Sequence, residues 1–371
     1  MIGFLVVVTA SIVWISVLVK IDENRKYKEL TKEVVIFFIF GFIFSGIAYF
    51  VENWVGKFMD LFLGESGFFR FVFSWMFVGF FEEAVKFSIT FVVLSGRRKI
   101  WEPKDIMIFA GAVSLGFATL ENMYYNLFVS VNIIGLRSVI SVVGHISYSS
   151  IWAVGIIIYL FNFYGEKRGK SLLLFSFLAA GLTHAIYDFL IELDFVSLSL
   201  AFVWDALVFI GAVYMFDAVV KESPYRRFRL SEADTAIEKI EKSLAVNRSN
   251  YLLNRKITIF YLYMGMFDRA LRALRVCLKQ RPKDLYIRFY IALLLYIVNP
   301  EDDARLRRLV GVAAEIDSVN PRILKVLERE VLRVLRESPF IDERVADRVA
   351  WVFSQFDPKS LVYGLYKMAG R

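Results

Sequence analysis

Seven long apolar segments occupy the first 220 residues, and they constrain the fold more than any other feature of the sequence. A helix needs roughly 20 residues to cross about 30 Å of hydrocarbon, and each segment supplies that length. With 57% hydrophobic residues, the chain is also more apolar than a water-soluble core requires. The sequence therefore predicts an all-α, polytopic membrane helical bundle of about seven spans. The predicted spans run from Ile2 to Val19, Val34 to Val51, Gly67 to Leu94, Ile106 to Ser130, Ser138 to Phe163, Ser171 to Ile191 and Val196 to Val220.

Composition changes after the last apolar segment, where Arg, Lys and Glu become frequent. We therefore expect a transmembrane domain over residues 1–220, a basic linker over 221–230 and a soluble α-helical domain over 231–371. The only cysteine, Cys277, is expected in the core of the soluble domain, and it excludes an intramolecular disulfide and any thiolate-held cofactor.

The soluble domain resembles tetratricopeptide repeats in part. Ala236, Ala270 and Ala304 recur every 34 residues, which is the length of that repeat. The Trp, Leu and Gly of the repeat's first helix are missing, and the third repeat is degraded. One hypothesis is that the domain is a docking module, which binds a protein partner or the cytoplasmic tail of the substrate. The alternative is that it is an appendage that stabilises or dimerises the protein. Further residues at the repeat's spacing are Tyr261, Gly265, Phe267 and Pro282.

Lysine and arginine accumulate on the cytoplasmic side of membrane proteins, and their positions here predict the orientation. They follow the first, third and fifth predicted spans, whereas the alternate connections hold Glu52, Asp60 and Arg137. The N-terminus is therefore expected outside the cell membrane and the soluble domain in the cytoplasm. The basic linker is expected to contact anionic lipid, and we expect no nucleic-acid partner. The basic residues of the three inner connections are Lys20, Arg25, Lys26, Lys28, Lys32, Arg97, Arg98, Lys99, Lys104, Lys167, Arg168 and Lys170.

Charged residues interrupt the third predicted span. Glu82 and Glu83 precede Lys86 by four and three residues, so all three share one face of a helix. A charge near the bilayer centre costs at least about 2.5 kcal/mol, which makes each a candidate functional group. An internal ion pair that only orients helices is the alternative, but such a pair needs one carboxylate and this span has two.

Three later spans contribute further ionisable groups. The fourth carries Glu121, the fifth His145, and the sixth His184 with Asp188 one helical turn later. These are the only two histidines in the chain, and both lie within predicted spans. Counting about 1.5 Å per residue places Glu121 and the histidines roughly 10 to 14 Å below the outer surface. Groups from four helices therefore reach one level, which predicts a site. Asp205 is a weaker candidate to line the same cavity, and Asp217 is expected to be solvated.

Two carboxylates, a lysine and two histidines suit the activation of water, with a glutamate as general base and histidine stabilising an oxyanion. Carboxylates and imidazoles also bind divalent metals or relay protons, so those alternatives stay open. The His-Glu-x-x-His signature of zinc proteases is absent. We expect no cofactor and no metal, because thiol ligands are missing and Lys86 lies close to any site built on Glu82 and Glu83.

In their order along the chain, these motifs resemble the PrsW family of intramembrane proteases, which is related to the CAAX prenyl endopeptidases. The resemblance covers roughly residues 30–220. It implies a glutamate-dependent endopeptidase that acts in the lipid bilayer on a membrane-anchored protein, such as an anti-sigma factor. The matching motifs are Glu82-Glu83-x-x-Lys86, Phe117-x-x-x-Glu121, the isolated His145 and His184-x-x-x-Asp188.

The resemblance also implies roles for single residues. Glu82 would be the general base, Glu121 would replace a histidine that helps polarise water, and His184 would face the oxyanion. Asp188 stands where the CAAX enzymes have Asn, and an ionised aspartate cannot donate a hydrogen bond. Asp188 would therefore be protonated or act by orienting His184.

Two other functions compete with a protease. A metal or proton-coupled transporter could use the same carboxylates and histidines, but it should show internal repeats or helices broken by Gly and Pro. No convincing repeat is present in the spans, and the seven prolines avoid the span centres. A non-catalytic receptor that signals through its helical tail is the third hypothesis.

Overall fold

The computed structural model describes residues 2–21, 28–63, 68–96, 102–128, 130–192 and 195–356. Fourteen α-helices and one short 3-10 helix form this part of the chain, and it contains no strand, which confirms the predicted fold class. The chain divides into two compact units, Met1–Ser223 and Pro224–Arg371. Several residues used to predict orientation lie outside the described ranges, namely Arg25, Lys26, Arg97, Arg98 and Lys99.

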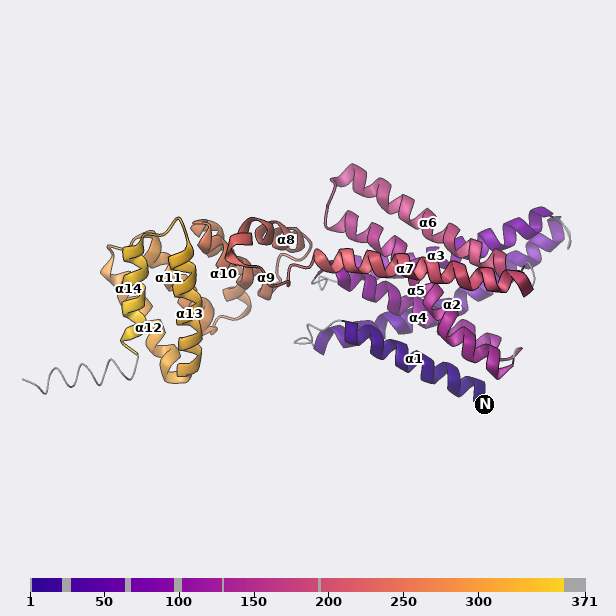
Figure 1. Ribbon diagram of the computed structural model, residues 1–371, viewed down its shortest axis with the longest axis horizontal. Helices are drawn as coiled ribbons and strands as arrows, with labels where there is room; N and C mark the ends of the chain where they lie inside the picture. The colour runs from indigo at the N-terminus through magenta and orange to yellow at the C-terminus, as the bar shows by residue number, and fades with distance from the viewer. Residues whose placement is uncertain are drawn as a thin grey trace, which may run out of the picture. The chain divides into compact units, whose positions relative to one another are not determined.

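The first unit is a bundle of long helices (Figure 1). Six of them, all except α3, are long and apolar enough to cross a membrane. The helix α3 carries the three charged residues of the third predicted span and packs against α2, α4, α5 and α6. The bounds are α1 (Ile2–Ile21), α2 (Lys28–Leu63), α3 (Phe68–Gly96), α4 (Pro103–Tyr125), α5 (Val131–Leu160), α6 (Glu166–Glu192) and α7 (Phe195–Lys221).

The central helix of this unit is α4, whose residues from Pro103 to Thr119 are nearly all buried. It begins where the sequence offers two start signals, a proline in its first turn and a capping box between Glu102 and Asp105. Glycine brings α2 close to it: a Cβ added at Gly41 would lie 2.0 Å from the carbonyl oxygen of Val113. Small residues allow such close contact between membrane helices, and here the contact fixes one wall of the site.

The helices α2 and α5 extend beyond the predicted spans, and this corrects the placement of two charged residues. α2 continues to Leu63, so Glu52 lies on the helix and not in a connection. α5 begins at Val131, so Arg137 also lies on a helix. Arg137 is accommodated there because its guanidinium pairs with Glu121, 2.6 Å away. The predicted fifth span begins at Ser138, one residue after Arg137, and therefore leaves this charge in the connection.

The second unit consists of short helices around a core of its own (Figure 1). Gly265 adopts a φ of 67° in the turn between α9 and α10, a conformation that favours glycine. Ala236 and Ala270 are fully buried, but Ala304 is exposed, so the 34-residue spacing does not place a third alanine in the core. The bounds are α8 (Ala233–Val246), α9 (Tyr251–Tyr263), α10 (Phe267–Gln280), α11 (Leu285–Val298), α12 (Asp303–Val319), α13 (Pro321–Glu337) and α14 (Glu343–Ser354).

Cys277 lies fully buried in this core, as predicted. Burial raises the pKa of its thiol to about 12, so the reactive thiolate is disfavoured at neutral pH. The side chain therefore acts as a small core residue.

Candidate active site

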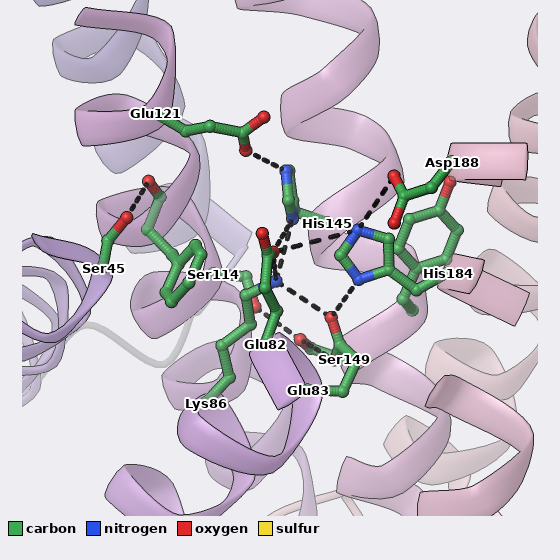
Figure 2. Close-up of polar contacts among 12 residues, drawn as sticks. Ser45, Glu82, Glu83, Lys86, Ser114, Glu121, His145, Ser149, His184 and Asp188 are labelled. Atoms are coloured by element: carbon green, nitrogen blue, oxygen red, sulfur yellow. Dashed lines mark hydrogen bonds and ion pairs between the residues drawn. The ribbon is translucent and has the colours of Figure 1, made fainter. Parts of the chain in front are cut away.

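A buried lysine lies at the centre of the site (Figure 2). The Lys86 ammonium donates to Glu82 Oε2 at 3.1 Å, to Glu83 Oε1 at 2.9 Å and to Nδ1 of His145 at 2.9 Å. It also lies 4.3 Å from the centre of the Phe117 ring. Lys86 is 0% exposed, so these three acceptors replace the water that a buried ammonium would otherwise need. The face shared by Glu82, Glu83 and Lys86 is thus held as one cluster.

Glu83 is completely enclosed and accepts four hydrogen bonds. Its Oε1 accepts one hydrogen bond from Lys86 and another from Nδ1 of His184 at 3.1 Å. Its Oε2 accepts hydrogen bonds from Ser149 Oγ at 2.9 Å and from the Trp152 indole N–H at 2.8 Å. Because a carboxylate has about four acceptor positions, Glu83 has no lone pair left for another group. Its side chain is a structural anchor for α3, α5 and α6.

His145 lies between a cation and a carboxylate. A charged lysine can only donate, so Nδ1 of His145 accepts from Lys86. The other nitrogen, Nε2, then carries the proton and donates to Glu121 Oε2 at 2.8 Å. Glu121 also accepts from Arg137, which in turn contacts Asn122 and stacks on Tyr125. The whole arrangement fixes both the tautomer and the orientation of His145.

His184 is oriented by Glu83 and by a ring that sequence reasoning missed. Its Nδ1 donates to Glu83, while Nε2 lies 3.8 Å from both Glu82 Oε2 and Asp188 Oδ1. The Tyr148 ring stacks on the imidazole at 4.8 Å, and the Tyr148 hydroxyl donates to the buried Asp205. Asp188 therefore lies near His184, as its spacing predicted, but Glu83 makes the short hydrogen bond.

The site opens into a cavity of about 590 Å³. Glu82, Glu121, His145, His184 and Asp188 line it, so helices α3 to α6 converge as the depth argument predicted. Glu83 and Lys86 lie behind this wall and are 0% exposed. The side chains of Glu121 and Asp188 are 23% and 24% exposed, so the cavity reaches the bundle surface. Sequence reasoning did not assign three further lining residues, Glu52, Trp75 and Arg137.

A membrane bundle that holds carboxylates and histidines around one cavity, with a lysine behind them, has the groups that a membrane-embedded enzyme needs. Comparison with known families agrees, because the family described as "PrsW family intramembrane metalloprotease" matches residues 29–219. The chain belongs to the PrsW family and is a protease. This membership does not favour the transporter alternative.

Curated relatives support the same assignment. The protease PrsW of Clostridioides difficile (strain 630) is 30% identical over 179 residues, which cover 47% of this chain and 73% of the relative. The protease PrsW of Geobacillus kaustophilus (strain HTA426) is 34% identical over 110 residues, or 30% of this chain and 48% of that protein. The protease PrsW of Bacillus subtilis (strain 168) is 30% identical over 118 residues, or 32% and 53%. No solved structure matches the chain.

The family description names a metal, and the cluster can be tested for one. Glu82, His145 and His184 offer ligand atoms that all lie within 4.8 Å of one another, and this donor set suits zinc. A metal-bound histidine usually donates its other N–H to a carboxylate, so Glu121 on Nε2 would leave Nδ1 of His145 as the ligand. That Nδ1 already accepts from the Lys86 ammonium, which also pairs with Glu82. In this arrangement the residues do not fit a bound metal ion, because an ion held by Glu82 and His145 would have to displace Lys86.

Proposed function

We propose that the chain is an intramembrane endopeptidase in which Glu82 activates the attacking water. One observation carries the choice of Glu82 over Glu83. Glu82 lines the cavity and accepts a hydrogen bond from Lys86, whereas Glu83 is enclosed by four donors. A general base must reach the proton that it removes, and of these two carboxylates only Glu82 faces the cavity.

The proposed reaction is a single hydrolysis. Glu82 accepts a proton from water while the water oxygen forms a bond to the scissile carbonyl carbon, which gives a tetrahedral oxyanion. The carbon–nitrogen bond then breaks, the proton held by Glu82 passes to the leaving amine, and a new carboxyl group remains. No covalent enzyme intermediate is required. The Lys86 ammonium, 3.1 Å from Glu82 Oε2, supplies the counter-charge for the ionised carboxylate.

His184 is the proposed partner of the oxyanion. Its Nδ1 is committed to Glu83, so Nε2 is the nitrogen that faces the cavity side of Glu82. When that nitrogen carries a proton it donates a hydrogen bond to the oxyanion, and the Asp188 carboxylate lies 3.8 Å from it. In this proposal Asp188 acts through His184. Glu121 acts through His145, which it orients at 2.8 Å.

We also propose a topology and a substrate class. With α3 counted as the seventh span, the basic connections support an N-terminus outside the cell and a second unit in the cytoplasm. The substrate is then a membrane-anchored protein cut in the outer half of the bilayer, and an anti-sigma factor is one example. The helical unit would bind a protein partner or the cytoplasmic tail of the substrate.

Cleavage of synthetic peptides tests the proposed function. We expect the purified protein, reconstituted in vesicles, to cut at least one of a panel of single-span peptides that differ in their outer flanking sequences. Mass spectrometry of the products should place the cut in the outer half of the span. A reconstituted, folded protein that cuts none of the panel would contradict the proposal, and cuts confined to the inner half would contradict the topology.

A further inference from the structure

Two polar atoms on the cavity wall have no role in the cluster described above. Glu52 on α2 and Trp75 on α3 both line the cavity. Glu52 Oε1 and Trp75 Nε1 are buried, and neither has a hydrogen-bond partner among the described residues. A buried polar group without a partner destabilises a fold, so such atoms call for an explanation. An ionised Glu52 carboxylate can only accept hydrogen bonds, and the Trp75 indole N–H can only donate one.

The position of Trp75 on α3 relates its indole to Glu82, the proposed general base. Trp75 precedes Glu82 by seven residues on α3, which is about two helical turns or roughly 10 Å on the same face. An extended peptide advances about 3.3 Å per residue. A substrate strand that passes Glu82 at its scissile bond therefore reaches Trp75 about three residues further along.

The chemistry of an intramembrane substrate supplies what these atoms lack. Within a helix, the peptide bonds are already hydrogen-bonded and sterically protected, so a spanning segment must unwind locally to be cut. Unwinding frees N–H and C=O groups at a depth where lipid offers them no partners. The enzyme cavity must then supply both a donor and an acceptor.

We propose that Trp75 and Glu52 bind the backbone of the unwound substrate segment, with Trp75 about three residues from the scissile bond. The Trp75 indole N–H donates to a substrate carbonyl, and the Glu52 carboxylate accepts from a substrate N–H. Both side chains are only partly buried as whole residues, so a rotamer change on binding brings the atoms to the peptide. This inference rests on the proposed protease function and assigns its substrate-binding groups.

A basic side chain in the substrate is the competing partner for Glu52. Charge distinguishes the two: glutamine keeps an acceptor oxygen for a backbone N–H but has no charge for a lysine or arginine. Leucine removes both. For Trp75, phenylalanine keeps an aromatic ring and removes only the donor.

The test measures kcat/KM with the panel peptide that the wild-type protein cuts fastest. Glu52→Leu and Trp75→Phe are each expected to lower kcat/KM about tenfold, the effect of one lost hydrogen bond, and Glu52→Gln about two- to threefold. Trp54→Phe is the matched control, because Trp54 lies two residues from Glu52, is 63% exposed and is expected to leave the rate unchanged.

Ester substitution in the peptide makes the test specific to the backbone. Replacing one amide at a time by an ester removes one N–H, and the ester at one single position should lower kcat/KM about tenfold in the wild-type protein. The same ester should cause no further loss in Glu52→Leu. Equal losses in Glu52→Gln and Glu52→Leu, or ester effects that add to those of Glu52→Leu, would overturn the inference in favour of a basic side chain.

Two other outcomes separate this inference from the proposed function. Wild-type cleavage that stays unchanged in Glu52→Leu and Trp75→Phe would overturn the inference and leave the protease intact. A wild-type protein that cuts no peptide would remove both.

Discussion

The Glu82→Gln protein is expected to stay folded and to cut its membrane-anchored substrate at least about a hundredfold more slowly than the wild-type protein. Glutamine preserves the shape of the side chain and can still accept the hydrogen bond from Lys86. It cannot accept a proton from water, so the attack loses its base. Turnover under saturating substrate, with the unfolding midpoint measured in the same detergent, checks the two halves of this prediction.

Asp217→Asn is the control for Glu82→Gln. Asp217 pairs with Lys221 at 2.6 Å but is 58% exposed and lies near the end of α7, away from the cavity. Its loss should leave turnover unchanged. Normal turnover by a folded Glu82→Gln protein would show that another group activates the water.

Replacing Lys86 with Met should destabilise the protein strongly. The ammonium is the counterion of Glu82 and Glu83, which are 6% and 0% exposed. Removing one partner of a buried ion pair typically costs about 3 to 5 kcal/mol, because the remaining charge is left without compensation. Methionine keeps most of the side-chain length, so packing against Phe117 changes little. Unfolding by titration with a denaturing detergent measures the loss, and activity should fall with it.

The matched control is Lys170→Met. Lys170 pairs with Glu166 at 2.6 Å with the same four-residue spacing, but the lysine side chain is 59% exposed. Water replaces the lost partner there, so the unfolding midpoint should not move. A Lys86→Met protein as stable as this control would mean that the two glutamates are not held as a buried ionised pair.

The convergence of the site could be predicted because polar groups are conspicuous in apolar spans. Glu82, Glu121, His145 and His184 interrupt segments where each charge or imidazole is expensive, and helical rise alone places them at one level. The all-α fold followed from the same long segments. These conclusions rest on local sequence and on the thickness of a bilayer.

The remaining site residues depend on tertiary packing and left weaker signals. Glu52 and Arg137 lie near span ends, where charges usually belong to connections, and only the lengths of α2 and α5 place them in the cavity. Tyr148 and Trp75 are aromatic residues of a kind common in membrane helices. The contact between Glu83 and His184 joins residues 101 positions apart, so the four-residue spacing to Asp188 gave the weaker partner.

The most direct test of the central claim, that Glu82 activates water without a metal ion, is the rate of peptide cleavage after chelation. The wild-type protein in vesicles would be treated with 1,10-phenanthroline, freed of it, and assayed beside an untreated sample whose zinc content is measured. Because the Lys86 ammonium occupies Nδ1 of His145 and pairs with Glu82, we predict equal rates and less than one zinc per chain. A rate that is lost on chelation and restored by stoichiometric zinc would contradict the account.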